Sequence, residues 1–111
     1  MSDNKTWCPI FTPIFRKHLM WWAKKAVRTR VGVRRKGMLT KTDSGKANKI
    51  LDLVEAVCQN PFQGIGKPEP LKYLDSNIWS RRINIEHRLI YRINGSRIYF
   101  LQCRYHYERR N

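Results

Sequence analysis

The chain has 111 residues, which is enough for one compact domain with one hydrophobic core but not for two domains of ordinary size. Lysine and arginine total 23 against 8 acidic residues, so the net charge at pH 7 is +15. A positive field of this size predicts a polyanionic partner: a nucleic acid, a ribosome, an acidic protein or an anionic membrane surface. A hydrophobic fraction of 41% excludes a wholly disordered chain.

The lack of a targeting signal and the spacing of the cysteines both predict a location inside the cell. No apolar run reaches the roughly eighteen residues of a membrane-spanning helix, and the start of the chain lacks the pattern of a secretory signal. The three cysteines, Cys8, Cys58 and Cys103, are far apart and odd in number, which predicts neither a metal pair nor a disulfide framework. We therefore expect a cytoplasmic protein whose cysteines serve in packing.

The first elements are a strand and a helix. Residues 7–11 are typical of a short opening strand, and Thr12 followed by Pro13 is a helix-start signal, since a hydroxyl can cap the first turn and proline lacks only an N–H that has no helical partner. The apolar positions that follow on one helical face are Phe15, Leu19 and Trp22.

A second helix is predicted from about residue 43 to 59, because apolar residues recur there at helical spacing and Asn60-Pro61 ends the pattern. Between the two helices, residues 23–39 hold seven basic residues and no acidic one. The segment shows no clear helical or strand period and contains two glycines. We therefore interpret it as a basic insertion or a long surface loop, either solvated or part of a nucleic-acid patch.

The second half of the chain is predicted to form a loop and a meander of strands. Glycines and prolines over 61–70 indicate a loop, and strand-like runs follow at 78–84, 87–93 and 97–104. Asn94-Gly95 between the last two runs is a hairpin signal, because both residues tolerate positive φ. The order strand, helix, helix, meander predicts a single α+β domain over 1–111, with two helices packed on one face of a small antiparallel β-sheet.

Residues that can carry chemistry gather in this second half. A ribonuclease without a metal needs a base for the ribose 2′-hydroxyl, a cation for the phosphoryl oxygens and an acid for the leaving 5′-oxygen. No Asp, Glu or His cluster has the spacing of a metal site, so we expect no cofactor. The candidate residues are Glu69, Lys72, Arg81, Arg82, Arg88, Arg104, His106 and Tyr107.

Three sequence blocks then resemble the YoeB/Txe branch of the RelE-like toxins. The blocks are NPFQGIGKPEPLK at 60–72, WSRRI at 79–83 followed by EHRLIY at 86–91, and CRYHY at 103–107. They occur in the family's order, and the second helix extends the resemblance back to about residue 43. The resemblance implies a RelE-like fold and a toxin of a type II toxin–antitoxin pair, which enters the A site of the bacterial ribosome and cuts mRNA there.

The resemblance also implies individual roles. Glu69 corresponds to the general base, Arg88 to the cation at the scissile phosphate, His106 to the general acid and Tyr107 to a residue that places the mRNA. The candidate RNA or phosphate contacts are Lys72, Arg81, Arg82 and Arg104, of which Arg81 can equally be a structural contact. Glu69 has the alternative of a surface salt bridge with Lys67 or Lys72.

The implied partners are a YefM/Axe-like antitoxin and the ribosome with its mRNA, and the resemblance alone also suggests a homodimer. Contact with DNA would be indirect, through the antitoxin. Three features depart from the family pattern: the 23–39 segment, the basic Lys17 and His18 where relatives often carry acidic residues, and four residues, 108–111, that follow the last block. The alternative function is an inactive RelE-like protein that binds RNA, the ribosome or an antitoxin; direct DNA binding ranks last, since no helix-turn-helix pattern is visible.

Overall fold

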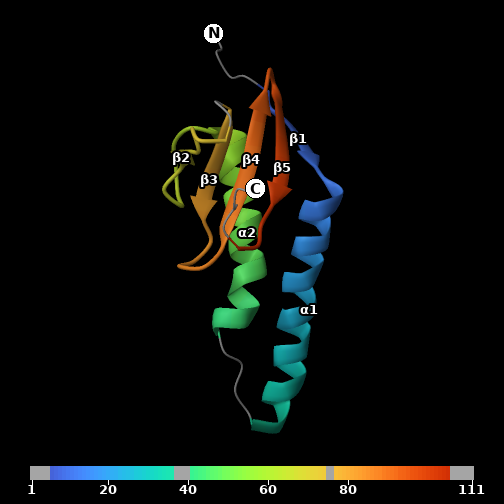
Figure 1. Cartoon of the computed structure of the whole chain (residues 1–111). Helices are drawn as coiled ribbons and strands as arrows, with labels where there is room; N and C mark the ends of the chain where they lie inside the picture. The colour runs from blue at the N-terminus through green and yellow to red at the C-terminus, as the bar shows by residue number, and fades with distance from the viewer. Residues whose placement is uncertain (1–5, 37–40, 75–76, 106–111) are drawn as a thin grey trace.

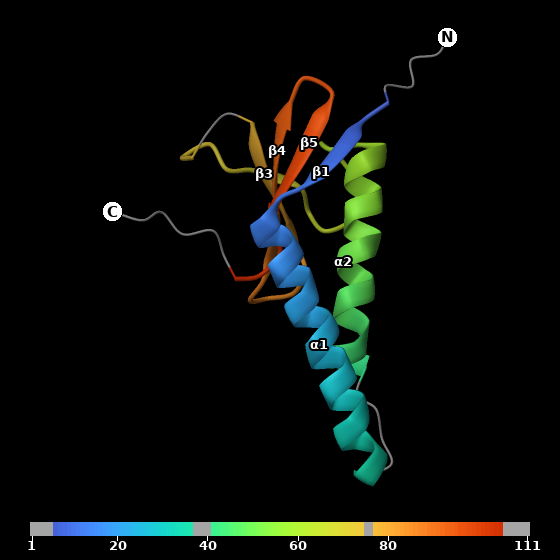
Figure 2. The same cartoon turned by 90° about the vertical axis from the view of Figure 1, so that its right-hand side faces the viewer.

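A computed structural model describes residues 6–36, 41–74 and 77–105 and shows two helices on one face of a five-stranded sheet (Figures 1 and 2). The sheet order is β1-β5-β4-β3-β2. None of the helices in the described part of the chain is long and apolar enough to cross a membrane. The elements are β1 (Cys8–Phe11), α1 (Pro13–Lys36), α2 (Lys41–Gln59), β2 (Glu69–Pro70), β3 (Ile78–Arg82), β4 (Arg88–Asn94) and β5 (Arg97–Gln102).

The sheet is mixed, so the expected antiparallel sheet is wrong at one edge. β1 pairs with β5 in parallel, with Phe11 beside Phe100, while the other three pairings are antiparallel. The Thr12 hydroxyl donates to the Phe100 carbonyl at 2.8 Å and so fastens the end of β1 to β5. Residue pattern locates a strand, but the direction of its neighbour depends on pairings between distant parts of the chain.

The basic segment is also not the loop that the sequence predicts. α1 continues without a break from Pro13 to Lys36, so residues 23–36 are helical, and 37–40 lie outside the described residues. Lysine, arginine and alanine are good helix formers, and Gly32 is the one glycine inside the helix. At 24 residues, α1 is about 36 Å long, and its second half extends with the start of α2 beyond the end of the sheet (Figure 2).

The predicted helix start and hairpin are confirmed. The Thr12 hydroxyl oxygen accepts the Phe15 N–H at 3.2 Å, which is N-cap geometry. In the β4–β5 hairpin, Asn94 pairs with Arg97, and Gly95 takes a φ of 65° between them. The core lies between the helices and one face of the sheet. Its fully buried side chains include Phe15, Trp22, Ile50, Leu53, Val57, Leu89, Tyr91, Ile98 and Phe100.

Candidate active site

The face of the sheet opposite the helices carries the predicted catalytic side chains that the structure describes. Leu89 and Tyr91 on β4 point into the core, and side chains alternate along a strand, so Arg88 and Ile90 point to the other face. Cross-strand register places Arg82 beside Arg88, and Ser80 beside Ile90. This face, toward the viewer in Figure 1, is the candidate site. We call it the open face because neither helix covers it, although the Ser80 and Ile90 side chains at its centre are buried.

Glu69 lies on the same face, because its strand β2 pairs with β3. It is the Cα partner of Ser80, which stands two residues before Arg82 on β3. The side chain is exposed, and within the described part of the chain no cation lies within 4.0 Å of its carboxylate. The alternative salt bridge with Lys67 or Lys72 is therefore absent, and the carboxylate is left available to accept a proton.

Arg88 lies at the start of β4 and is half-buried. Its guanidinium donates to the carbonyl of Asn84 at 3.3 Å, which leaves most of its five N–H groups unused by the described residues. Arg82 is exposed beside it. Two arginines directly opposite each other repel, and a phosphate between them would relieve that repulsion.

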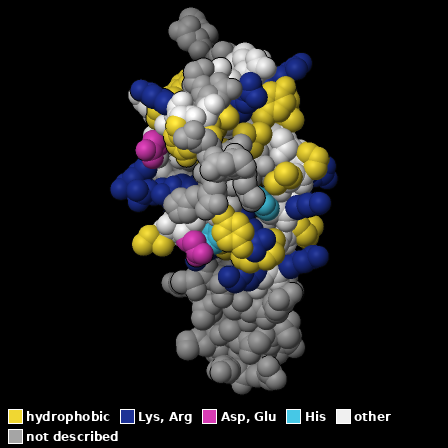
Figure 3. All heavy atoms as spheres, in the orientation of Figure 1, with side chains coloured by type: hydrophobic (Ala, Val, Ile, Leu, Met, Phe, Trp, Pro, Cys, Tyr) yellow, Lys and Arg dark blue, Asp and Glu magenta, His cyan; other side chains and the backbone are white. Residues whose placement is uncertain are grey.

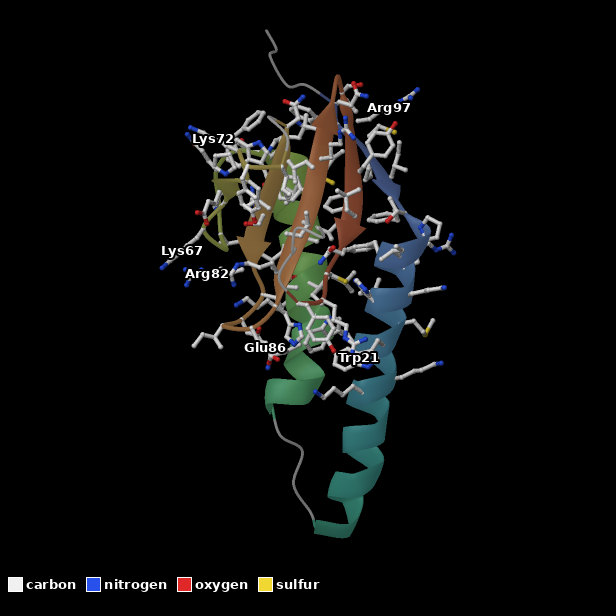
Figure 4. All side chains as sticks on the ribbon, viewed as in Figure 1. Trp21, Lys67, Lys72, Arg82, Glu86 and Arg97 are labelled. Carbon is white, nitrogen blue, oxygen red and sulfur yellow. The ribbon has the colours of Figure 1, made fainter. Side chains whose placement is uncertain are left out.

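Further cations surround this face. Figure 4 shows Lys67, Lys72 and Arg82 pointing outward at the β2–β3 edge, and all three are exposed. In the space-filling view from the same side, lysine and arginine side chains ring the described surface and acidic ones are few (Figure 3). Such a surface suits a phosphate backbone more than a particular base sequence.

Arg81, by contrast, is buried and faces the core, so it cannot be the phosphate contact that the sequence suggested. Its Nη2 atom donates to the carbonyls of Asn60 at 2.6 Å and Gln63 at 3.0 Å. Nη1 donates to Ile65 at 3.0 Å, and Nε to the Tyr91 hydroxyl at 3.2 Å. Arg81 therefore holds the loop that leads to Glu69, which is the structural role left open by the sequence.

The segment 103–105, after β5, is held by side chains for which the sequence analysis predicted no such role. His18 on α1 accepts the Cys103 N–H on Nδ1 at 3.2 Å, and the Trp22 indole N–H donates to the Cys103 carbonyl at 2.8 Å. His87 accepts the Tyr105 N–H on Nδ1 at 2.6 Å. No local pattern points to these bonds, because each joins residues far apart in sequence.

Arg104 lies against aromatic rings between these anchor points. Its guanidinium carbon is 3.7 Å from the Trp21 ring centre and 4.5 Å from that of Tyr105, and Nη2 donates to the Tyr105 hydroxyl at 2.7 Å. Its Nε is buried and has no hydrogen-bond partner among the residues that the structure describes. Stacking of this kind is a cation–π interaction. The Arg104 side chain is therefore engaged mostly with side chains of this protein, and its role as an RNA or phosphate contact stays a prediction.

Burial lowers the pKa of both histidines. Burial is the largest cause for His87, opposed by Glu86 and reinforced by Arg104, Lys25 and Lys46. For His18, burial is again the largest cause, followed by the charges of Arg104 and His87. A neutral ring is required in each case, because Nδ1 must keep a lone pair to accept the main-chain N–H.

The sequence of this chain matches a family model. Residues 37–107 match the model described as "YoeB-like toxin of bacterial type II toxin-antitoxin system". The chain belongs to this YoeB-like toxin family. The match includes every predicted site residue, and α1 lies before it.

Curated relatives agree with this membership. The chain is 49% identical over 67 residues to Toxin YoeB of Synechocystis sp., which covers 60% of this chain and 78% of that protein. It is 47% identical over 66 residues to Toxin YoeB of Escherichia coli K12, which covers 60% of this chain and 79% of that protein.

Solved structures extend the similarity to the whole YoeB-like fold. A YoeB/ParE toxin from Agrobacterium tumefaciens superposes with a TM-score of 0.69 at 35% identity, over 90% of this chain and 99% of that one. A YoeB dimer from Staphylococcus aureus gives a TM-score of 0.69 at 29% identity, over 92% and 99%. A YoeB–YefM heterotetramer from the same species gives 0.66 at 29%, over 91% and 98%.

The structure thus brings together part of the predicted YoeB-like site. Glu69, Arg82 and Arg88 share the open face. His106 and Tyr107 lie outside the described residues, but they follow Tyr105, whose carbonyl accepts the Arg88 N–H at 3.1 Å. Among the described residues, no three His, Cys, Asp or Glu side chains lie together where they could hold a metal ion.

Proposed function

We propose that this YoeB-like toxin is a ribosome-dependent mRNA endonuclease that cleaves in the A site. The observation that carries the proposal is the shared open face, on which the Glu69 carboxylate and the Arg82–Arg88 pair lie on three adjacent strands. A proton acceptor and two cations on one accessible surface are the groups that phosphodiester cleavage requires.

The reaction proceeds by attack of the ribose 2′-oxygen. Glu69 takes the proton of the 2′-hydroxyl, and the oxygen forms a bond to the adjacent phosphorus. Arg88 stabilises the charge on the phosphoryl oxygens, while the bond from phosphorus to the 5′-oxygen breaks. His106 supplies the proton for the leaving oxygen, and the products are a 2′,3′-cyclic phosphate and a 5′-hydroxyl. That this cleavage needs no metal remains a prediction.

Substrate placement falls to the neighbouring side chains. Lys72 and Arg82 contact phosphate at the exposed β2–β3 edge, and Tyr107 positions the mRNA. Stacking on aromatic rings and contacts to phosphate are the usual means of gripping single-stranded RNA. The high positive charge of the chain supports docking on rRNA in the cytoplasm.

A YefM/Axe-like antitoxin is the proposed regulator. The S. aureus relative forms a complex with YefM, and another S. aureus structure is a dimer. We infer the same two kinds of assembly for this chain. An acidic, partly disordered antitoxin segment would be steered to the basic surface and cover the site.

Primer extension on an mRNA in a reconstituted translation reaction tests the proposal. The wild-type protein should create new 5′ ends within A-site codons, and Glu69→Gln and Arg88→Gln should abolish them. Arg97→Gln is the matched control. It also removes one positive charge, but from an exposed residue at the start of β5, away from the labelled Arg82 (Figure 4). Equal loss in Arg88→Gln and Arg97→Gln would show that charge alone is needed.

The alternative is an inactive family member that binds RNA, the ribosome or an antitoxin. It predicts co-sedimentation with ribosomes, lost steeply as salt rises, without new 5′ ends. Cleavage by the wild type would contradict it. Direct DNA binding is the least supported function, because the sequence shows no helix-turn-helix pattern.

A further inference from the structure

The backbone of Tyr105 is held at both of its polar groups by two consecutive residues. The His87 ring accepts its N–H at 2.6 Å, and the Arg88 N–H donates to its carbonyl at 3.1 Å. Tyr105 has a φ of 63°, a left-handed conformation that costs a residue with a side chain on the order of 1–3 kcal/mol. The two hydrogen bonds offset this strain and keep the chain bent.

The position of this bend matters for the site. Tyr105 immediately precedes His106 and Tyr107 in the sequence, and Arg88 belongs to the open face. The peptide that leads to the proposed acid is therefore tied to the strand residue that carries the proposed phosphate-binding cation.

His87 itself has no direct access to substrate. The side chain is buried, and its ring packs edge-on against Trp22 at 4.9 Å and beside Tyr105 at 5.2 Å. Its backbone closes the β3–β4 turn, because its carbonyl accepts the Ile83 N–H at 3.0 Å and its N–H donates to the Asn84 side chain at 2.6 Å. A ring fixed in this way is a rigid hydrogen-bond acceptor.

We propose that His87 is a positioning residue for cleavage: its neutral ring holds the Tyr105 peptide, and through it sets where His106 begins relative to Arg88. The inference rests on the proposed function. A proton on Nδ1 would turn the acceptor into a donor facing the Tyr105 N–H, so the bond would break and the bend would lose its support. Within the described part of the chain, the charged or titratable groups that act on the ring or pack beside it are Glu86, Arg104, Lys25, Lys46, His18 and Tyr105.

Two substitutions separate hydrogen bonding from packing. His87→Asn keeps a short side-chain acceptor for the Tyr105 N–H but loses the ring. His87→Phe keeps a ring against Trp22 but loses the acceptor. If His87 positions the chain, His87→Phe lowers the single-turnover rate of mRNA cleavage on the ribosome by on the order of 100-fold, with ribosome affinity unchanged, while His87→Asn stays within a few-fold of wild type. The reverse order would overturn the proposal.

The pH profile gives a second readout. In the wild type, protonation of the His87 ring breaks its hydrogen bond with the Tyr105 N–H, so the cleavage rate falls at acid pH. The side chain introduced by His87→Asn cannot be protonated, so the acid side of the rate profile should move to lower pH. An unchanged profile would contradict a role for the His87 proton. Failure of the wild type to cleave at all would instead overturn the proposed function.

Nuclear magnetic resonance of the wild-type protein tests the contact without any substitution. The ¹⁵N shifts of the His87 ring should show the proton on Nε2 at neutral pH. As the ring is protonated, the amide protons of Tyr105 and His106 should move with the same midpoint. A ring protonated on Nδ1 at neutral pH, or a Tyr105 amide that does not follow the titration, would refute the proposal even if the variants fail to fold.

Discussion

Arg82 and Arg88 lie directly opposite each other on β3 and β4, with both side chains on the face that the helices leave open. Like charges at this cross-strand position destabilise a sheet. Neither arginine forms an ion pair with a carboxylate in the described part of the chain. We therefore expect the pair to destabilise the free protein, and an anion such as a phosphate between the two side chains to remove this cost.

Replacing Arg82 with glutamine should stabilise the fold and weaken RNA binding. Loss of the repulsion is expected to raise the free energy of unfolding by about 0.2–1 kcal/mol at low salt, and the gain should shrink as salt screens both charges. Urea denaturation at two salt concentrations measures it. Destabilisation at low salt would mean that Arg82 is held by favourable contacts.

Arg81, its neighbour in sequence, should behave in the opposite way. Arg81→Ala removes four hydrogen bonds and leaves three loop carbonyls without their donor. The free energy of unfolding should fall by more than about 2 kcal/mol. The exposed Arg97→Ala is the control and should stay within about 0.5 kcal/mol of wild type. Similar values for the two variants would be evidence against the buried role.

Substitution of Gly66 tests the packing of the loop before Glu69, and substitution of Gly45 in α2 is the comparison. Gly66 has a φ of 86°, and a Cβ there would lie 2.7 Å from the Leu53 side chain and 3.1 Å from the Arg81 Cβ. Gly66→Ala should therefore cost about 1–3 kcal/mol. Gly45 lies within α2 with open space around it, so Gly45→Ala should gain about 0.4–1 kcal/mol. Thermal unfolding of both variants measures the contrast, and a stable Gly66→Ala protein would show that the loop is free to move.

Stability should decrease on acidification because of two histidines, the buried His87 and the half-buried His18. His18 and His87 both have a pKa below the ordinary 6.5 in the folded protein, so the unfolded chain binds more protons just below that pH. Their contribution is fully present above pH 6.5 and is lost as the pH falls through the folded-state values. The melting temperature should fall between pH 7 and 5, and less so in His87→Asn. An equal fall in both proteins would assign the effect to other groups.

Sequence alone predicted the main elements in their order, apart from β2 and the second half of α1, and it supplied the candidate catalytic residues. Helix starts, glycine turns and alternating strands depend on neighbours within a few residues, so Thr12, Gly95 and the α2 pattern could be interpreted locally. Glu69 and Arg88 could be named because the surrounding blocks match a known family.

Only the tertiary structure decided which strands pair and which side chains are buried or in contact. The parallel β1–β5 pairing, the burial of Arg81 beside the exposed Arg82, and the acceptance of the Tyr105 N–H by His87 all join distant residues. The sequence contains two adjacent arginines with the same chemistry, and only their alternation across a packed sheet separates the loop support, Arg81, from the proposed RNA contact, Arg82. Burial and register are properties of the assembled chain, because they depend on which surfaces meet when it folds.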